Sequence, residues 1–322
     1  MADPNIGQTI TQAWESVVKP DPEDNIFEEY WLLDRLKQGK SFKAHDGGRN
    51  IEHRLEYATN TSVGWYSDLE PVSTTRIDCF DSGRYAWKEC AGTVVQSELE
   101  SAINQGSGGK FDLLAAKLKN MKTSFYKLIN EALFSTGQGT SSKEIGGMQL
   151  LCSTTPTTGT VGEINAATWS FWRNIAVTGT MTTAAFDNLR AAMRSCYNQV
   201  SVGYGGKHPT FGATTRAVFE GFEGLLLANE RFTDKSVGDG GFKNEVLKFK
   251  GMLLAYDADC LAATVYMANE SDLILNYQKG YWMRMLKEVD PANQTATIRR
   301  CMTIANLSTG ARRKLGCVHT IT

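Results

Sequence analysis

Hydrophobic positions follow the period of a helix over one long stretch of the chain. From Lys110 to Phe134 they recur at alternating spacings of three and four, which places them on one helix face. The stretch contains neither glycine nor proline, and a helix of this length measures on the order of 37 Å at 1.5 Å per residue. The expected buried stripe consists of Phe111, Leu114, Leu118, Met121 and Phe125. The pattern predicts an exceptionally long core helix.

The period changes to two from Arg49 onward. Hydrophobic or aromatic residues alternate with charged ones over residues 51–57, as in a strand with one buried face. Residues 62–71 and 84–96 are also predicted strands, separated by the polar stretch 72–84. This β region has few core residues of its own, and isolated two-stranded hairpins are only marginally stable in water. We therefore expect a neighbouring molecule to cover it.

Aromatic residues in this region and in a later segment have two interpretations. Trp65, Tyr66, Tyr85 and Trp87 fit the core of a small β layer or contacts between subunits, because aromatic side chains are enriched in both settings. The segment 162–174, GEINAATWSFWRN, concentrates three aromatic residues within four positions and is either core or a family signature. Residue type alone does not separate these alternatives.

The rest of the chain mixes helical and strand patterns. Helices are predicted over residues 25–40, where Phe27, Trp31 and Leu32 or Leu36 share a side, after the capping box of Ser97–Glu100, and over residues 183–201 and 214–227. The stripe of the helix over 183–201 consists of Phe186, Leu189, Met193, Cys196 and Val200. Short strands are predicted at residues 245–251, 252–257, 264–269 and 272–277, and within 295–322 as two strands joined at residues 308–310. The chain is thus α+β with an antiparallel emphasis.

Composition and motifs exclude several classes of function. A net charge of −1 over 322 residues gives no basic excess for a free-standing nucleic-acid binder, and no stretch has the length and apolarity of a membrane-spanning helix. The start of the chain lacks the features of a signal peptide. Seven scattered cysteines without a C-x-x-C pair indicate reduced buried thiols in a cytoplasm.

No catalytic or cofactor motif is complete. The stretch GQGTSSKE at residues 137–144 lacks the second glycine of a phosphate loop and the Ser or Thr after its lysine, and the four histidines lack metal-ligand spacing. Asp257 and Asp259 fit a carboxylate site less well than a turn. We expect no catalytic residue, cofactor or metal, and therefore no enzyme, although a triad assembled in space stays open.

The order of the segments resembles a known family. SVGWYSDLEP, YAWKECAGTV, the long helix, TVGEINAATWSFWRN, ERFTD, GFKNEVLKFKGMLLAYDADC, TVYMAN and NLSTGARRKLG follow one another. Over about residues 45–322 this sequence resembles major capsid proteins of tailed bacteriophages, which have the Hong Kong 97-type (HK97-like) coat fold. None of the motifs is specific alone, whereas their order and spacing together are.

The resemblance implies a division of the chain and a role for each part. It implies an N-terminal arm at residues 1–48, an extended loop at 49–92, a peripheral domain at 93–174 with its spine helix at 110–134, an axial domain at 175–289, and C-terminal strands at 290–322 that return to the peripheral domain. The extended loop would contact a neighbouring subunit through Trp65, Tyr66, Phe80, Tyr85 and Trp87. The residues with a packing role would be Trp169, Trp172 and Arg173.

The function implied is that of a virion shell subunit without enzymatic activity. Hexamers and pentamers would form an icosahedral head around double-stranded DNA, assembled in the host cytoplasm, with portal, scaffolding and decoration proteins as partners and no membrane. An arm of at most about 45 residues favours a separate scaffolding protein, or none, over a fused one. Two alternatives stay open: an encapsulin-like compartment that encloses cargo enzymes, and a soluble enzyme whose site assembles in space.

Overall fold

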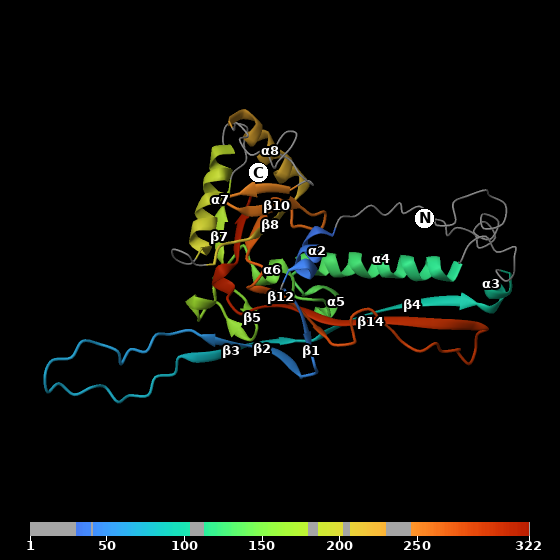
Figure 1. The fold of residues 1–322 in the computed structure, drawn as a ribbon, viewed down its shortest axis with the longest axis horizontal. Coiled ribbons are helices and arrows are strands. Elements are labelled where there is room, and N and C mark those ends of the chain that lie inside the picture. The colour runs from blue at the N-terminus through green and yellow to red at the C-terminus, as the bar shows by residue number, and fades with distance from the viewer. Residues whose placement is uncertain are drawn as a thin grey trace.

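The computed structural model describes residues 30–39, 41–103, 113–179, 186–201, 207–229 and 246–321. Two β-sheets, a long helix and a projecting hairpin make up the fold (Figure 1). Among the described strands, most pairs are antiparallel, and three are parallel. The α+β prediction with an antiparallel emphasis is confirmed.

The first sheet contains an unusually long strand ribbon. Strand β14 (Ala296–Thr309) pairs over ten positions with β4 (Lys88–Ser97), from Ala296 opposite Ser97 to Ala305 opposite Lys88. The other edge of β14 pairs with β12 and β13, and β1 pairs with β12 in parallel. The bounds of these three strands are Phe42–His45 for β1, Leu273–Gln278 for β12 and Arg284–Met285 for β13.

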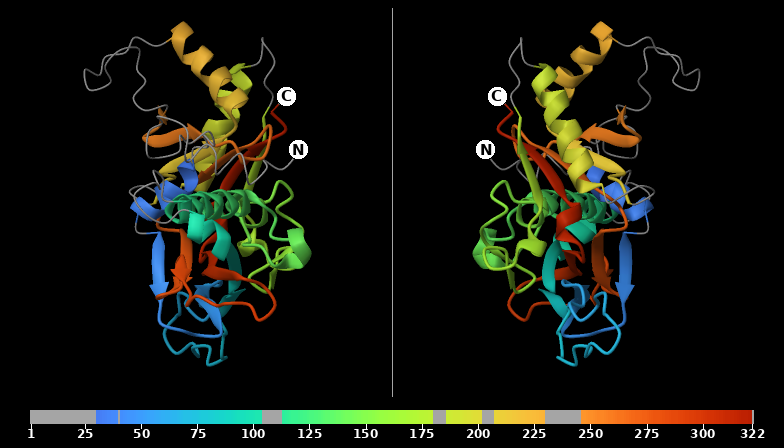
Figure 2. Two further views of the ribbon diagram at one scale, coloured as in Figure 1. Left: turned by 90° about the vertical axis from the view of Figure 1, so that its right-hand side faces the viewer. Right: turned by 90° about the vertical axis from the view of Figure 1, so that its left-hand side faces the viewer.

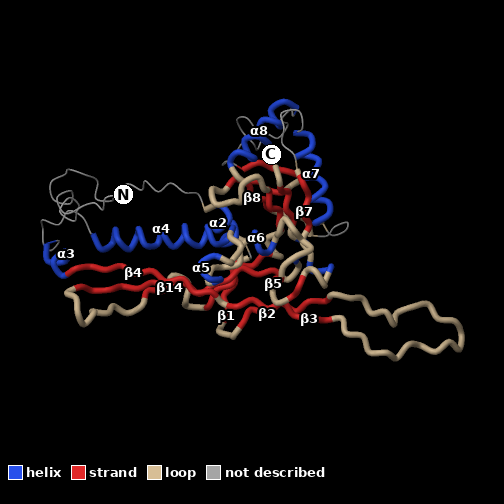
Figure 3. The backbone as a smooth tube through the Cα atoms, turned by 180° about the vertical axis from the view of Figure 1, so that it is seen from behind, coloured by secondary structure: helices blue, strands red, loops and turns tan. Residues whose placement is uncertain are grey.

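The long helix lies along this ribbon. Helix α4 (Leu113–Phe134) runs beside β4 and β14, and α3 (Glu98–Ile103) lies at the far end of the ribbon (Figures 1 and 3). The predicted long helix is confirmed over these residues, whereas Phe111 lies outside the described residues. The capping box at α3 is confirmed, because the Leu99 amide donates to Ser97 Oγ and the Ser97 amide to Glu100 Oε2.

The second sheet forms a separate lobe with its own core. Helices α7 (Phe186–Val200) and α8 (Arg216–Asn229) cover it (Figure 2). Leu189, Met193, Cys196 and Val200 of α7 are buried there, which confirms these members of the predicted stripe. In spatial order, the strands are β7 (Ile175–Thr178), β15 (Gly316–His319), β11 (Val265–Ala268), β8 (Phe211–Thr214), β10 (Met252–Tyr256) and β9 (Val246–Phe249).

The chain crosses between the two lobes near its C-terminal end. Strand β14 ends in the first sheet at Thr309, and β15 begins in the second sheet at Gly316. The sequence correctly predicts two strands here but gives no sign that they belong to different sheets. Between them lies the short helix η2 (Arg312–Lys314). Arg312 is buried, and its guanidinium donates to the carbonyl oxygens of Leu150, Leu151 and Trp172.

Residues near the start of the described chain belong to the main core. Helix α2 (Trp31–Gln38) buries Leu32, Leu33 and Leu36 completely, and β1 extends the first sheet. Both elements fall within the residues 1–48 predicted as an arm. The predicted side of this helix is correct for Leu32 and Leu36, whereas Trp31 is only partly buried and Phe27 lies outside the described residues.

The hairpin projects from the end of the body opposite to α3 (Figures 1 and 3). Its strands are β2 (Asn50–Glu56) and β3 (Phe80–Ala86), which pair along their whole length. Residues 57–79 form an extended loop, and residues 58–78 make no strand pairing, so the prediction of a strand at 62–71 is wrong. The remaining short elements are α5 (Gly139–Ser142), α6 (Met148–Leu151), β5 (Thr160–Val161), β6 (Ile164–Asn165) and η1 (Ser170–Trp172). Across the described residues, no helix is both long enough and apolar enough to cross a membrane.

Candidate subunit-contact surfaces

The hairpin loop exposes a group of large apolar side chains. Trp65 is fully exposed at 103%, and the hydrogen bonds of Ser62, Tyr66 and Ser67 stay within the loop. Large apolar side chains exposed along one projecting segment mark it as a candidate interaction site. The exposed apolar residues of the loop and of the first position of β3 are Val63, Trp65, Tyr66, Leu69, Val72 and Phe80.

Two aromatic residues at the root of the hairpin behave differently. Tyr85 is buried, its hydroxyl donates to the Thr309 carbonyl oxygen at 3.0 Å, and burial raises its pKa. Trp87 packs partly buried against the main core, and its Nε1 donates to the Gly48 carbonyl oxygen at 2.9 Å. The assignment of Tyr85 as a contact to a neighbour is therefore wrong, whereas for Trp87, which stays partly exposed, it stays a prediction. Both side chains are used inside the subunit, because segments distant in sequence cover the root.

The segment after β5 packs against this root. Trp172 is 1% exposed, and its Nε1 donates to the Val161 carbonyl oxygen at 2.8 Å. The Arg173 guanidinium donates to the carbonyl oxygens of Ala166 and Ala167, both at 2.8 Å, which closes residues 166–173 into a tight loop. These contacts support packing roles for Trp172 and Arg173. Trp169, in contrast, is 43% exposed.

Trp169 belongs to an aromatic cluster at the point where the hairpin loop begins. The ring of Tyr57 stacks on Phe171 with centroids 5.4 Å apart and meets Trp169 edge-on at 5.5 Å. Gly162, with φ of +59°, brings its carbonyl oxygen to the Arg84 amide at 3.0 Å. A Cβ at this glycine would lie 3.2 Å from the Tyr85 ring, so glycine suits both the backbone angle and the close approach.

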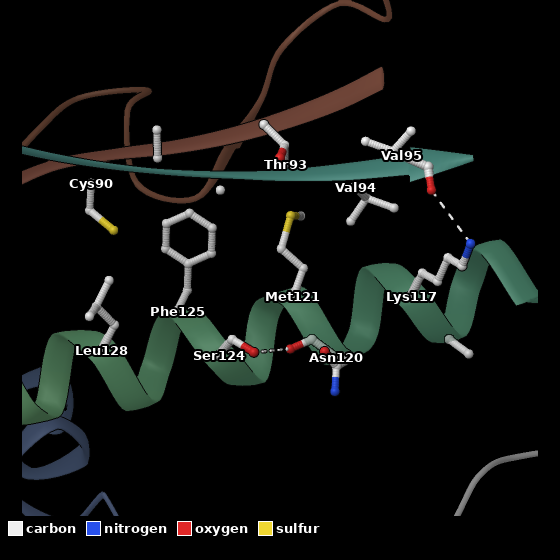
Figure 4. A pocket seen from close by; sticks show the side chains of 13 residues that line it. Cys90, Thr93, Val94, Val95, Lys117, Asn120, Met121, Ser124, Phe125 and Leu128 are labelled. Atoms are coloured by element: carbon white, nitrogen blue, oxygen red, sulfur yellow. Dashed lines mark hydrogen bonds between the residues drawn. The ribbon is translucent and has the colours of Figure 1, made fainter. Parts of the chain in front are cut away.

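A second apolar surface lies between α4 and β4. Figure 4 shows Met121 and Phe125 pointing from the helix toward the strand, where they floor an open groove of about 690 Å³. Gly92 permits this approach, because a Cβ there would lie 2.7 Å from the Phe125 ring. Lys117 crosses the far end of the groove, with Nζ 3.4 Å from the Val95 carbonyl oxygen.

The spine-helix stripe is only partly the one expected. Met121 and Phe125 are buried as predicted, whereas Leu114 and Leu118 are half-buried. Toward the C-terminal end of α4 the buried line continues through side chains of the main core, Ile129, Leu133 and Phe134. The helix therefore serves two cores, a small one against β4 and the main one, and its buried face changes between them.

The carboxylate pair forms a buried turn that ties three elements together. Asp257 Oδ2 accepts the Leu32 amide of α2, and Oδ1 accepts the Asn130 side-chain amide of α4 and the Asp259 amide. Burial raises the Asp257 pKa to about 6. These contacts favour the turn interpretation. Among the described residues, no group of three or more His, Cys, Asp or Glu side chains is placed to hold a metal ion.

Comparisons with known proteins identify solved structures that share this fold. No family model matches the sequence, and no curated protein matches it. Solved structures match nearly the whole chain. The capsid asymmetric unit of cyanophage A-1(L) aligns with a TM-score of 0.70 and 16% identity, covering 94% of this chain and 96% of that one. The chain has the Hong Kong 97-type capsid fold.

Further matches with this capsid fold come from different kinds of particle. The capsid of a native GTA particle aligns with a TM-score of 0.64 and 13% identity, over 95% of this chain and 96% of that one. The holo-SrpI encapsulin complex from Synechococcus elongatus aligns with a TM-score of 0.61 and 11% identity, over 100% and 96%. Shared architecture at such low identity reflects the fold and leaves function to be argued from the surfaces.

Proposed function

We propose that this protein is a major capsid protein, which assembles as hexamers and pentamers into the icosahedral head shell of a tailed bacteriophage. The observation that carries the proposal is the projecting loop 57–79, which exposes the large apolar side chains of Val63, Trp65, Tyr66, Leu69 and Val72 to solvent. Covering them requires another molecule, and a second copy of the chain in a ring provides one at every position. Of the predicted contact residues, Trp65, Tyr66 and Phe80 keep this role.

The physics of a shell suits such a subunit. Contacts around a ring are heterologous, so one surface of each copy meets a different surface of the next, and the rotation between copies decides whether the ring closes. Each subunit engages several neighbours at once, so modest contacts add up to a stable shell. The net charge of −1 suits a wall that encloses DNA without clamping it.

The proposal extends to the parts and partners of the shell. The first sheet with α4 would be the peripheral domain, and the lobe containing α7 and α8 would be the axial domain near the symmetry axis of each capsomer. Portal, scaffolding and decoration proteins would bind the shell, which would enclose double-stranded DNA in the virion after assembly in the host cytoplasm. The protein would act as a building block rather than as an enzyme.

Expression of the chain alone tests this function. Sedimentation velocity and electron microscopy of the purified protein should reveal capsomers or closed shells of uniform diameter. A monodisperse species of 35.5 kDa at every concentration, without assembly at raised salt or with crowding agents, would contradict the proposal.

An encapsulin-like compartment is the second candidate, favoured by the alignment of the whole chain with the SrpI encapsulin complex. The contents of particles purified from the native source separate the two functions. A phage head should contain double-stranded DNA protected from nuclease, whereas a compartment should contain a stoichiometric cargo protein and no protected DNA.

A further inference from the structure

We propose that Tyr57, Trp169 and Phe171 form an aromatic bracket that fixes the direction in which the hairpin loop leaves the body. The inference rests on the proposed function, because it assigns positioning residues to the loop that would reach a neighbouring subunit. It gives the segment 162–174 a specific role: part of the segment is core, and part of it supports the start of the loop.

The paired part of the hairpin ends at Tyr57. Strand β2 ends at Glu56, and the Tyr57 amide then makes a further cross-strand bond to the Cys79 carbonyl oxygen at 3.0 Å. The Tyr57 hydroxyl donates to the Asp78 carbonyl oxygen at 2.7 Å. Beyond this point the backbone bonds within residues 58–77 are local turns, such as Val63 to Asn60. Tyr57 is thus where the paired hairpin becomes a free arm.

The ring of Tyr57 is held by the other two members of the bracket. It stacks on Phe171 at an interplanar angle of 24° and meets Trp169 at 61°. Trp169 and Phe171 also contact each other, with centroids 6.0 Å apart. Offset-stacked and edge-on arrangements of this kind are the favourable geometries for aromatic pairs. The contacts on two sides of one ring restrict both its tilt and its translation.

The platform beneath the bracket is held by hydrogen bonds and is continuous with the core. Phe171 contacts the buried Trp172 at a centroid distance of 6.2 Å. The two hydrogen bonds of Arg173 and the bond from the Trp169 amide to the Asn165 carbonyl oxygen brace the intervening backbone. A side chain fixed by packing and by surrounding hydrogen bonds can hold a functional element in place, which a mobile loop cannot.

The other strand of the hairpin is tied to the same platform. The Arg84 amide of β3 donates to the Gly162 carbonyl oxygen, and its guanidinium lies 3.8 Å from Glu163 Oε2 and 3.1 Å from Glu52 Oε1. Both strands are therefore fixed at the root, and the bracket lies where the loop begins. A small rotation of Tyr57 would move the tip of a long arm through a large distance.

The direction of the loop is measurable in single subunits. Nitroxide labels at Thr74→Cys in the loop and Arg194→Cys on α7, with Cys79 and Cys90 changed to serine, report the distance between loop and body by pulsed electron resonance. In dilute, unassembled protein the parent should give one narrow distance distribution. Trp169→Ala and Tyr57→Ala should each at least double the width of this distribution. Trp169→Phe, which keeps an aromatic ring, should give a width close to that of the parent.

Trp65→Ala is the matched control, because it removes the same ring type within the loop but outside the bracket, and it should leave the width unchanged. A broad distribution in the parent, or no change with Trp169→Ala, would overturn the inference. Circular dichroism and the melting temperature decide whether each variant is folded, and Trp169→Leu replaces any variant that is not. This measurement needs no shells, so a parent that fails to assemble would refute the proposed function and leave the bracket standing.

A readout on shells completes the test. If the bracket sets the direction of the loop, Trp169→Ala should give particles of mixed diameter at a melting temperature close to that of the parent. Trp65→Ala should instead raise the concentration needed for assembly by about 30-fold or more while the diameter stays uniform. Particles of normal, uniform diameter from Trp169→Ala would contradict a positioning role.

Discussion

Trp65 and Trp172 lie in two aromatic-rich regions that differ in burial and in hydrogen bonding. Trp172 lies in the main core, where its indole nitrogen donates to Val161 and its ring is 1% exposed. Trp65 lies in the hairpin loop with its ring fully in solvent. The Trp172 side chain is buried within its own subunit, whereas the Trp65 side chain is left exposed for contact with another molecule.

The difference indicates that one part of the chain stabilises the subunit and another part mediates association. The two sheets, α4 and the segment 160–174 make a body that has its own buried cores. The loop 57–79 adds apolar surface to the subunit without adding to those cores. Substitutions should therefore separate into those that lower the free energy of unfolding and those that weaken association.

Loss of the Trp172 ring should give the largest effect on the subunit. Trp172→Ala removes a buried ring and leaves the Val161 carbonyl oxygen without its donor, and large-to-small core changes of this type cost about 3–5 kcal/mol. Thermal or denaturant unfolding should register this loss. Trp169→Ala, three residues earlier and half-exposed, is the control and should cost much less. An equal loss of unfolding free energy in the two variants would contradict the distinction between a buried and a half-exposed tryptophan.

Asp257 offers a pH-dependent test of the body. Its pKa is raised to about 6 from 3.8, so the folded state favours the protonated form. Its contribution to stability is complete below about pH 4 and is lost as the pH rises through 6. About 2 pKa units correspond to at most about 3 kcal/mol.

The measurement compares the melting temperatures of the parent and of Asp257→Asn between pH 4 and pH 7.5. The parent should lose stability relative to the variant as the pH rises through this window. A difference between the two proteins that stays constant with pH would show that Asp257 does not titrate in the folded state as described.

Loss of the Trp65 ring should leave the body intact and weaken association. Truncation of a buried aromatic anchor at an interface to alanine commonly costs about 2 kcal/mol or more of binding free energy. Trp65→Ala should keep the parental melting temperature in dilute subunits but shift assembly to higher concentration, followed by light scattering. Trp65→Phe, which keeps an aromatic ring, should lie between the two. A lowered melting temperature would instead place Trp65 among the residues of the subunit core.

The hydrophobic periodicity of the sequence correctly predicts the buried face of a helix that packs against a single surface. The α7 stripe is correct at Leu189, Met193, Cys196 and Val200, because these residues pack one face of the helix on one sheet, whereas the Phe186 side chain lies outside the described part. The α4 stripe is correct only at Met121 and Phe125, because the helix passes from the groove against β4 to the main core. Leu128 continues the expected spacing and is nevertheless 50% exposed, while Ile129 is buried.

The hairpin shows why the candidate site was harder to predict. Tyr85 and Trp65 are both aromatic residues in a polar setting, and nothing local separates them. Tyr85 is buried because Thr309 and Gly162, far away in sequence, close over it. The bracket likewise joins Tyr57 to a segment more than 100 residues later. Such contacts depend on the tertiary fold, which no periodicity in the sequence encodes.

Replacement of the loop tests the division between body and loop most directly. Residues 58–78 are exchanged for Asn-Gly, a two-residue turn that suits the twist of a hairpin and keeps the bond between Tyr57 and Cys79. Sedimentation velocity and a thermal melt are then recorded on the same sample. The account predicts a subunit with a parental melting temperature that forms no closed shells. A subunit that unfolds, or shells of normal stability, would contradict it.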